Sequence, residues 1–426
     1  MNVVLKYGTD GLPLTLPETP GFRGVLAPSE PGVVPDPGDA VAKAVADPIG
    51  GRPLFDLARG RKSACIVVSD VTRPVPNTVL LPPILATIEG AGIPRENILL
   101  LVATGMHRPS SPEEIVRLAG PGIARDYRVV DHDGKRRGDM VEVGRIGGRV
   151  PALVNRAYVA ADLKILTGFI EPHMWAGYSG GRKSILPGIC SVETLEYMHG
   201  PGMVAHPGCE YGLLDGNPFH EAGLEVMAMA GADFIVNVTL STAREITGIF
   251  AGHPVAAHAA GCRFLARHCV RELAAPLDFI VTTNAGAPLD CNLYQTVKGI
   301  TGAAPAVKEG GDIVIASRCH EGAGSAEYRK ILGMVDSPRD FVGRLMRNEF
   351  FVPDQWCAQE TYQVLSARTV WLYSDGLSAE EAARYHFHPV RDVAACVRDL
   401  LAKHGPGARW AVVPDGPMLI LKVASS

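Results

Sequence analysis

The chain has 426 residues, which at about 100–200 residues per domain predicts two or three domains, and we expect two. Lys and Arg total 41 against 45 Asp and Glu, and no basic block occurs along the chain, which argues against a nucleic-acid partner. No uninterrupted apolar stretch of about 18 residues is present, so we expect no membrane-spanning helix and no membrane partner.

The N-terminal residues and the cysteines indicate the compartment. The first twenty residues lack an apolar run behind a basic start, so no secretory leader is predicted. The nine cysteines are scattered singly and form no C-x-x-C pair, which disfavours a disulfide framework or a thiolate zinc site. A cytoplasmic protein with reduced thiols is the expectation.

Alternating strands and helices predict the fold class. The segment up to Asp47 is rich in Pro and Gly and is expected to hold edge strands and loops. Short apolar runs then follow that read as buried parallel strands, with helical stretches between them at 81–89, 112–118, 254–269 and 379–385. The runs cover residues 63–70, 97–105, 161–169, 233–240, 278–286, 311–318, 369–376 and 409–416.

This alternation predicts an α/β protein with two α/β domains, largely parallel sheets and an active-site crevice between them. We expect a catalytic, cofactor-binding domain over residues 1–270 and a second domain over 271–426 that closes over the substrate. The final strand could instead return to the first domain.

Polar residues follow three consecutive predicted strands. Asp70, Thr72 and Arg73 follow the first strand, His107 follows the second, and the segment 168–183 follows the third. Ligands of open α/β sheets bind beyond the carboxyl ends of the strands, so these residues are predicted to share one crevice. The alternative for Asp70 and Thr72 is turn or helix-capping chemistry.

The segment 168–183 ends in a basic glycine turn. Gly180 and Gly181 expose backbone N–H groups, and Arg182 and Lys183 add charge, which suggests an anion cradle. The P-loop pattern fails, because Arg182 stands where its second glycine is required. His173 and His199 flank the turn and indicate acid–base chemistry or metal binding, although a single histidine is more often structural.

The second half of the chain offers fewer candidates. Gln295 and Lys298 would share one face of a helix and could bind a carboxylate, or could be a solvated helix surface. Trp356 is equally compatible with core packing. His386 and His388 are interpreted as structural, and His320 and Glu321 are left without a role.

Taken together, these motifs resemble the nickel-pincer-nucleotide lactate racemases, and the resemblance runs nearly end to end. The matching motifs are DVTRP from Asp70, TGxHRP from Thr104, EPHxxAGYSGGRKSxLPG from Glu171, His199, YQxxKG from Tyr294 and PDQW from Pro353.

The resemblance implies a cofactor and the residues that hold it. The cofactor would be a nickel-bearing pyridinium-3-thioamide-5-thiocarboxylic acid mononucleotide, joined covalently to Lys183, with His199 as the protein ligand of Ni(II). The residues holding the nucleotide would be Asp70, Thr72, Gly180, Gly181 and Arg182. Loading requires the enzymes that synthesise the cofactor as partners.

The resemblance also implies an isomerase reaction on a small 2-hydroxy acid. Hydride would leave Cα for the cofactor, giving pyruvate from lactate, while His107 and His173 exchange the hydroxyl proton. Arg73 would polarise the substrate oxygen, and the substrate-binding residues would be Tyr294, Gln295, Lys298 and Trp356, with Lys298 also counted as catalytic. Met174 and Trp175, just after His173, are bulky and leave the size of the acid open.

Three alternatives stay open on sequence alone. The first is a racemase or epimerase of a different 2-hydroxy acid with the same chemistry. The second is a metal-dependent hydrolase with His107, His173 and His199 as ligands, and the third is a non-catalytic nucleotide or cofactor carrier that uses the glycine turn alone.

Overall fold

The computed structural model describes residues 1–424, and they divide into two compact units. The middle unit comprises Glu30–His199 and Gly208–His268; the terminal unit comprises the N-terminal segment Met1–Ser29, the short segment Gly200–Pro207 and the chain from Cys269 onward. The chain passes from the middle unit to the terminal unit at Cys269, next to the domain boundary expected at 270–271. Residues 1–29 were expected in the first domain, whereas here they belong to the terminal unit.

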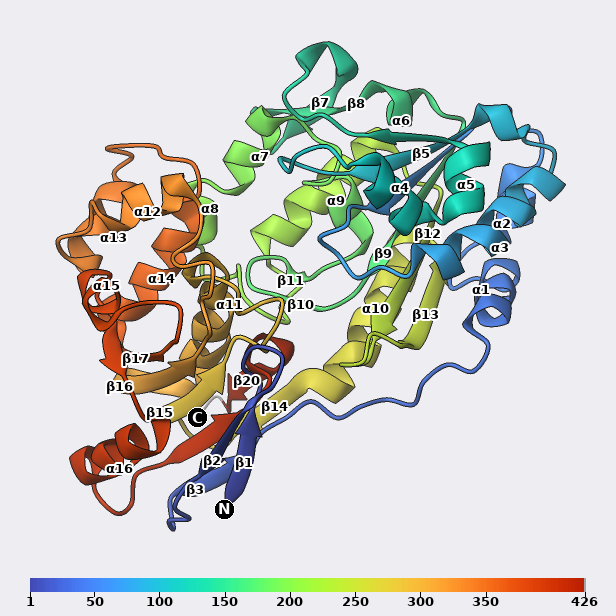
Figure 1. Cartoon of the computed structure of the whole chain (residues 1–426). Coiled ribbons are helices and arrows are strands. Elements are labelled where there is room, and N and C mark those ends of the chain that lie inside the picture. The colour runs from blue at the N-terminus through green and yellow to red at the C-terminus, as the bar shows by residue number, and fades with distance from the viewer. Residues whose placement is uncertain (425–426) are drawn as a thin grey trace. The chain divides into compact units, whose positions relative to one another are not determined.

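A six-stranded sheet of order β13-β12-β9-β4-β5-β6 forms the centre of the middle unit (Figure 1). All neighbouring strands are parallel except the pair β12–β13. Most residues of β4 are buried, as expected for a strand covered on both faces, which is why it reads as a continuous apolar run. The strands are β4 (Ala64–Ser69), β5 (Ile98–Ala103), β6 (Arg128–Asp131), β9 (Leu163–Phe169), β12 (Phe234–Leu240) and β13 (Ile246–Gly252).

Helices α1, α2 and α3 pack on one face of this sheet, where Val41, Leu54 and Leu81 join its apolar core. Two hairpins, β7–β8 (Met140–Ile146, Val150–Asn155) and β10–β11 (Pro172–His173, Gly177–Tyr178), stand apart from the sheet. The helices of the unit are α1 (Pro37–Ala46), α2 (Leu54–Ala58), α3 (Asn77–Gly90), α4 (Pro112–Ala119), α5 (Pro121–Asp126), α6 (Arg156–Ala160), α7 (Val192–Met198), α9 (Pro218–Ala230) and α10 (Pro254–Cys269).

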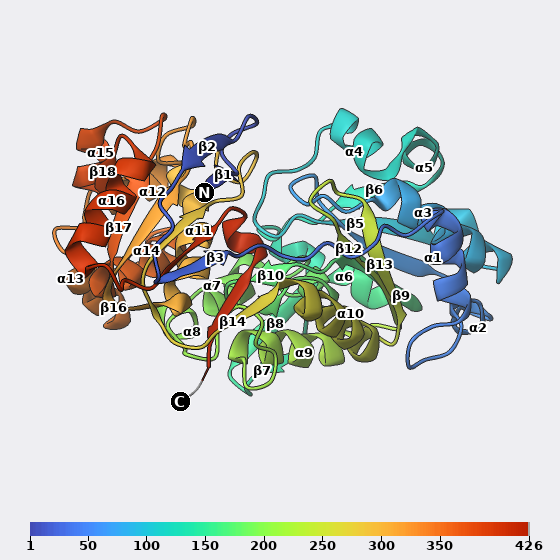
Figure 2. The ribbon, with the colours of Figure 1, turned by 90° about the horizontal axis from the view of Figure 1, so that it is seen from below.

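The terminal unit has its own six-stranded sheet, of order β18-β17-β16-β15-β19-β3 and parallel throughout. The N-terminal strand β3 pairs with β19, which explains why the first residues join this unit. A separate parallel pair, β14 with β20, lies side by side in Figure 2. The strands are β1 (Asn2–Leu5), β2 (Leu12–Thr15), β3 (Phe22–Val25), β14 (Val270–Leu273), β15 (Leu277–Thr283), β16 (Val307–Ala316), β17 (Thr369–Tyr373), β18 (His388–Val390), β19 (Trp410–Val413) and β20 (Ile420–Val423).

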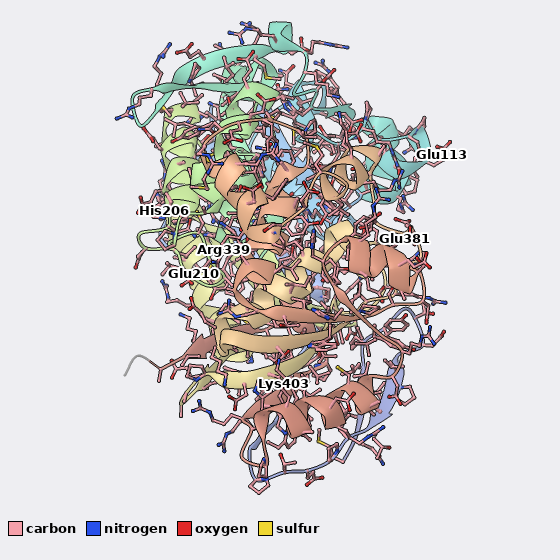
Figure 3. All side chains as sticks on the ribbon, turned by 90° about the vertical axis from the view of Figure 1, so that its left-hand side faces the viewer. Glu113, His206, Glu210, Arg339, Glu381 and Lys403 are labelled. Atoms are coloured by element: carbon pink, nitrogen blue, oxygen red, sulfur yellow. The ribbon has the colours of Figure 1, made fainter. Side chains whose placement is uncertain are left out.

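A buried carboxylate ties this sheet to its last helix. Asp312 of β16 is fully buried and accepts hydrogen bonds from Lys403, labelled in Figure 3, and from His404 and Trp371. Burial alone would raise the pKa of Asp312, but these donors lower it below its ordinary value. The helices of the unit are α8 (Pro201–Val204), α11 (Leu293–Ala303), α12 (Ala326–Leu332), α13 (Pro338–Met346), α14 (Gln355–Ala367), α15 (Ala379–Arg384) and α16 (Val393–His404).

The predicted fold class is confirmed, because both units are α/β and their sheets are largely parallel. Each of the eight predicted apolar strands is present, and so are the four predicted helical stretches. Within residues 1–424, no helix is long and apolar enough to cross a membrane. The expectation that failed concerns the segment before Asp47, which holds helix α1 as well as strands and loops.

Candidate active site

Asp70, at the carboxyl end of β4, fixes the orientation of His107. One carboxylate oxygen lies 2.6 Å from His107 Nδ1, and the other accepts from the Thr72 hydroxyl at 2.6 Å. Burial alone would raise the pKa of Asp70, but hydrogen bonds from His107 and Thr72 lower it, so the group is an ionised acceptor. Nδ1 of His107 therefore carries a proton, and Nε2 of the neutral ring holds the lone pair.

Asp70 and Thr72 were predicted at the periphery of a bound nucleotide, and that role stays a prediction. Their hydrogen bonds within the chain serve His107 instead. Arg73, next along the loop, places Nη1 3.9 Å from Glu171 Oε1. This half-exposed ion pair contributes little stability, but it connects the end of β4 with the segment that carries His173.

His173 sits in the hairpin β10–β11 with its ring held by the backbone. The N–H groups of Trp175 and Ala176 both donate to its Nδ1, each at 3.2 Å. Nδ1 is therefore the acceptor, and the proton of the neutral ring is on Nε2. His107 and His173 thus hold opposite tautomers, one with an acceptor at Nε2 and the other with a donor there.

The rings of Trp175 and Phe219 bring three predicted site residues together. The Phe219 ring lies 6.4 Å from His173, 5.8 Å from His199 and 5.9 Å from the Lys183 ammonium. Trp175 meets His199 edge-on at 5.2 Å and stacks on Phe219 at 6.3 Å. Phe219 was missed by the sequence analysis, because a lone Phe at the start of a helix carries no signal of its own.

His199 ends helix α7 and has the features of a neutral metal ligand. Its Nδ1–H donates to the carbonyl oxygen of Leu195 at 2.9 Å, so Nε2 carries the lone pair. Desolvation by surrounding atoms, and then the nearby Lys183 charge, lower the pKa of His199 to about 4. A carbonyl partner on the second nitrogen is the usual arrangement of a metal-binding histidine.

In residues 1–424 there is no group of three or more His, Cys, Asp or Glu side chains arranged to hold a metal ion. The hydrolase alternative requires such a group from His107, His173 and His199. A single protein ligand is the arrangement expected when a cofactor supplies the other donors.

The basic glycine turn forms the short 3-10 helix Gly181–Ser184, which carries Lys183. Gly180 and Gly181 have φ values of 80° and 55°, and a Cβ on Gly181 would lie 2.8 Å from the His258 ring. Arg182, predicted to hold a phosphate, is 1% exposed and donates to the carbonyl oxygens of Ala176 and Gly180. Its contacts within the chain are therefore those of a structural support.

The predicted substrate residues lie on two helices of the terminal unit. Tyr294, Gln295 and Lys298 belong to α11, where Gln295 and Lys298 are three residues apart and share a face, as predicted. Trp356 of α14 donates from Nε1 to the Tyr294 hydroxyl at 3.3 Å.

Histidines predicted to be structural have structural contacts. His386 Nε2 lies 2.6 Å from the Val335 carbonyl oxygen, and His388 packs on Trp371 at 4.8 Å. Glu321, left without a role, accepts from Asn292, the residue that caps α11. His320 is exposed and is still assigned no role.

We expect the protein to lose stability in acid because of two buried histidines. Burial, with a contribution from the Arg182 charge, lowers the pKa of His220 to about 3 and that of His258 well below its usual value. The unfolded chain protonates both near pH about 6.5, so each costs up to about 1.4 kcal/mol per pH unit below that. Urea unfolding from pH 7 to 4 would measure the slope, and His220→Gln should make it shallower; an unchanged slope would contradict this.

Comparisons with known proteins agree over nearly the whole chain. Residues 7–212 match the lactate racemase N-terminal domain, and residues 273–421 match the lactate racemase C-terminal domain. A lactate racemase of Thermoanaerobacterium thermosaccharolyticum is 34% identical over 429 residues, 99% of each chain. Another, from Lactiplantibacillus plantarum, is 36% identical over 390 residues, 90% of this chain and 91% of the relative.

Solved structures extend the similarity to the fold. The lactate racemase apoprotein of Thermoanaerobacterium thermosaccharolyticum matches with a TM-score of 0.93 and 33% identity, covering 99% of this chain and 100% of that one. A Thermotoga maritima protein matches with a TM-score of 0.67 at 17% identity, over 93% of this chain and 100% of its own; this second match concerns the fold alone.

Proposed function

The chain belongs to the lactate racemase family and is an isomerase, and from this premise we propose that it interconverts D- and L-lactate by hydride transfer through pyruvate with a nickel-pincer nucleotide. The grouping of Lys183, His199 and His173 around the Phe219 ring carries this proposal. It collects an amine, a metal-ligating imidazole and a proton-transfer group in one small volume.

The residues present fit such a cofactor. His199 is a neutral imidazole whose second nitrogen is hydrogen-bonded to a carbonyl oxygen, and it would hold the nickel, for which imidazole is a suitable ligand. Lys183 offers its amine for the covalent link, beside the same aromatic ring. When bound, the group supplies an acceptor and donor of hydride. This chemistry avoids a carbanion next to a carboxylate, which a side-chain base forms only over a high barrier.

Proton exchange falls to the two histidines. His107 is oriented by an ionised carboxylate and accepts the hydroxyl proton at Nε2, and Asp70 stabilises the imidazolium that results. His173 would act as the acid in its protonated form, returning a proton to the oxygen of the keto acid and so becoming the neutral ring; for the other enantiomer the two histidines exchange roles. Two groups of opposite role suit a reaction whose two enantiomers present their hydroxyls differently.

Charged and polar side chains recognise the carboxylate of the acid. Lys298 and Gln295 from one face of α11 are proposed to bind it, and Arg73 to polarise the substrate oxygen. Tyr294 and Trp356, already joined by a hydrogen bond, would complete the wall. Trp175 is 6% exposed and packs on His199, so its bulk narrows the space near the proposed metal ligand and favours a small acid such as lactate.

A panel of 2-hydroxy acids tests the function. The protein would be co-produced with the cofactor-synthesising enzymes, incubated with single enantiomers, and the products separated by chiral chromatography. We expect lactate to racemise and a bulky acid to react at least 10-fold more slowly. Racemisation of a larger acid but not of lactate would keep the chemistry and change the substrate, and no racemisation by protein modified on Lys183 would overturn the proposal.

A further inference from the structure

Arg182 is a buried cation without an anionic partner. Its side chain is 1% exposed, and no carboxylate of residues 1–424 forms an ion pair with it. Its remaining polar neighbour is His258, whose Nε2 lies 3.0 Å from Nη1, and its Nε makes no hydrogen bond within the same described residues. The guanidinium stays protonated, because burial lowers its pKa only to about 10.

Burying a guanidinium without an anionic partner is energetically unfavourable. Removing a charge from water is strongly unfavourable unless hydrogen bonds or an opposite charge compensate for it. Here the compensation comes from two backbone carbonyls, with neutral imidazoles as neighbours. A methionine of similar length would fill the space at lower cost, which indicates that the hydrogen bonds themselves are needed.

These hydrogen bonds connect directly to His173. Nη2 of Arg182 donates to the carbonyl oxygen of Ala176 at 2.6 Å, and the N–H of the same Ala176 donates to Nδ1 of His173. Nη1 donates to the carbonyl oxygen of Gly180 at 3.3 Å, beyond the second strand of the hairpin. The guanidinium therefore binds the chain on both sides of β11 (Gly177–Tyr178), which pairs with the strand of His173.

Neighbouring contacts hold the guanidinium in this position. A Cβ on Gly223 of α9 would lie 2.7 Å from Arg182 Cγ, so the stem of the side chain lies directly against this helix. His258 of α10 lies within 2.8 Å of the Ser179 carbonyl oxygen and supports the same loop. The planar fork of Arg can reach both carbonyls at once, whereas the single ammonium of Lys cannot do so with the same geometry.

We propose that Arg182 is a positioning residue for His173: it fixes the hairpin so that two backbone N–H groups meet Nδ1, and it thereby keeps the proton of the neutral ring on Nε2. Arg182 touches neither substrate nor cofactor in this role. The predicted effect on turnover rests on the proposed function, whereas the predicted tautomer of His173 does not.

Nitrogen NMR of the unloaded protein tests the tautomer directly. Protein labelled with 15N-histidine would be compared as wild type, Arg182→Lys and Arg182→Met, with His173→Gln to assign the signal. We expect His173 Nδ1 to resonate as an unprotonated acceptor in the wild type, and the tautomers to mix in both variants. An Nδ1 signal unchanged in both variants would overturn the inference, whatever reaction the protein performs.

Kinetics of the loaded protein separate positioning from support of the fold. In Arg182→Lys we expect kcat to fall about 10–100-fold, as for lost supporting contacts at other sites, with KM changed less than 3-fold and the adduct on Lys183 retained. Arg117→Lys, which makes the same change at an exposed arginine of α4, serves as the matched control, with kcat within about 3-fold of wild type. Equal losses in the two variants, or normal turnover in Arg182→Lys, would contradict the proposal. If Arg182→Met does not fold, the Arg182→Lys variant alone still tests the proposal.

Discussion

Replacing Lys183 with alanine is expected to abolish covalent attachment of the cofactor, and with it all measurable racemisation. The amine lies 5.9 Å from the Phe219 ring, in the cluster that also holds His199 and His173. A thioamide link requires a nucleophilic amine at this point, and alanine offers none. The measurement is the intact mass of denatured protein co-produced with the cofactor-synthesising enzymes.

The matched control is Lys135→Ala, which removes an exposed lysine from another loop of the middle unit and should retain both adduct and activity. An adduct of wild-type mass on Lys183→Ala would place the link on another residue. A wild-type protein that never carries an adduct but racemises lactate would remove the covalent cofactor from the proposal.

Strands were predictable from sequence because burial on both faces leaves little choice of residue. The runs that became β4 and β5 are apolar along almost their whole length, and a polar residue follows directly after the apolar part of each. The rule that parallel sheets bind ligands at the carboxyl ends of their strands then selects Asp70, His107 and the segment to Lys183. The structure joins Asp70 to His107, as the rule anticipates.

Helix α1 was not predicted, because of the composition of the residues around it. The residues before it are rich in Pro and Gly, which indicates loops, yet Asp36 caps the helix and Pro37 occupies its first turn, where a missing N–H costs nothing. Val41 and Val45, four residues apart, supply its buried face. A short helix with two buried apolar positions gives too weak a period to outweigh such a composition.

Long-range contacts could not be predicted. The pairing of β3 with β19 joins residues nearly 400 positions apart, which no local pattern records. Phe219 contacts its neighbours only after α9 has packed, and the sequence gives no sign that the Arg182 side chain is buried and hydrogen-bonded to two backbone carbonyl oxygens. In both cases the residue type was visible in the sequence, whereas the direction of the side chain was not.

Replacing His107 with alanine is expected to leave the Lys183 adduct intact and to lower kcat by about 10²–10⁴-fold, the usual contribution of a general base. His107 is half exposed and held by Asp70, so its removal should not disturb the core. The intact mass of the denatured protein measures the adduct, and the rate of lactate racemisation measures kcat. His388→Ala, an exposed histidine of the terminal unit, is the control, and normal turnover in His107→Ala would remove this residue from the mechanism.

Asp70→Asn tests whether the carboxylate acts through His107. The carboxamide of Asn can donate an N–H to Nδ1 of His107, or its neutral oxygen can accept a hydrogen bond from Nδ1–H. It therefore no longer enforces the Nδ1–H tautomer and no longer stabilises the imidazolium with a negative charge. We expect kcat to fall about 10²-fold. Because Asp70 works only through the ring that it binds at 2.6 Å, the double variant Asp70→Asn/His107→Ala should be no slower than His107→Ala alone. Losses that instead multiply would mean that Asp70 acts independently, as a ligand of the nucleotide would.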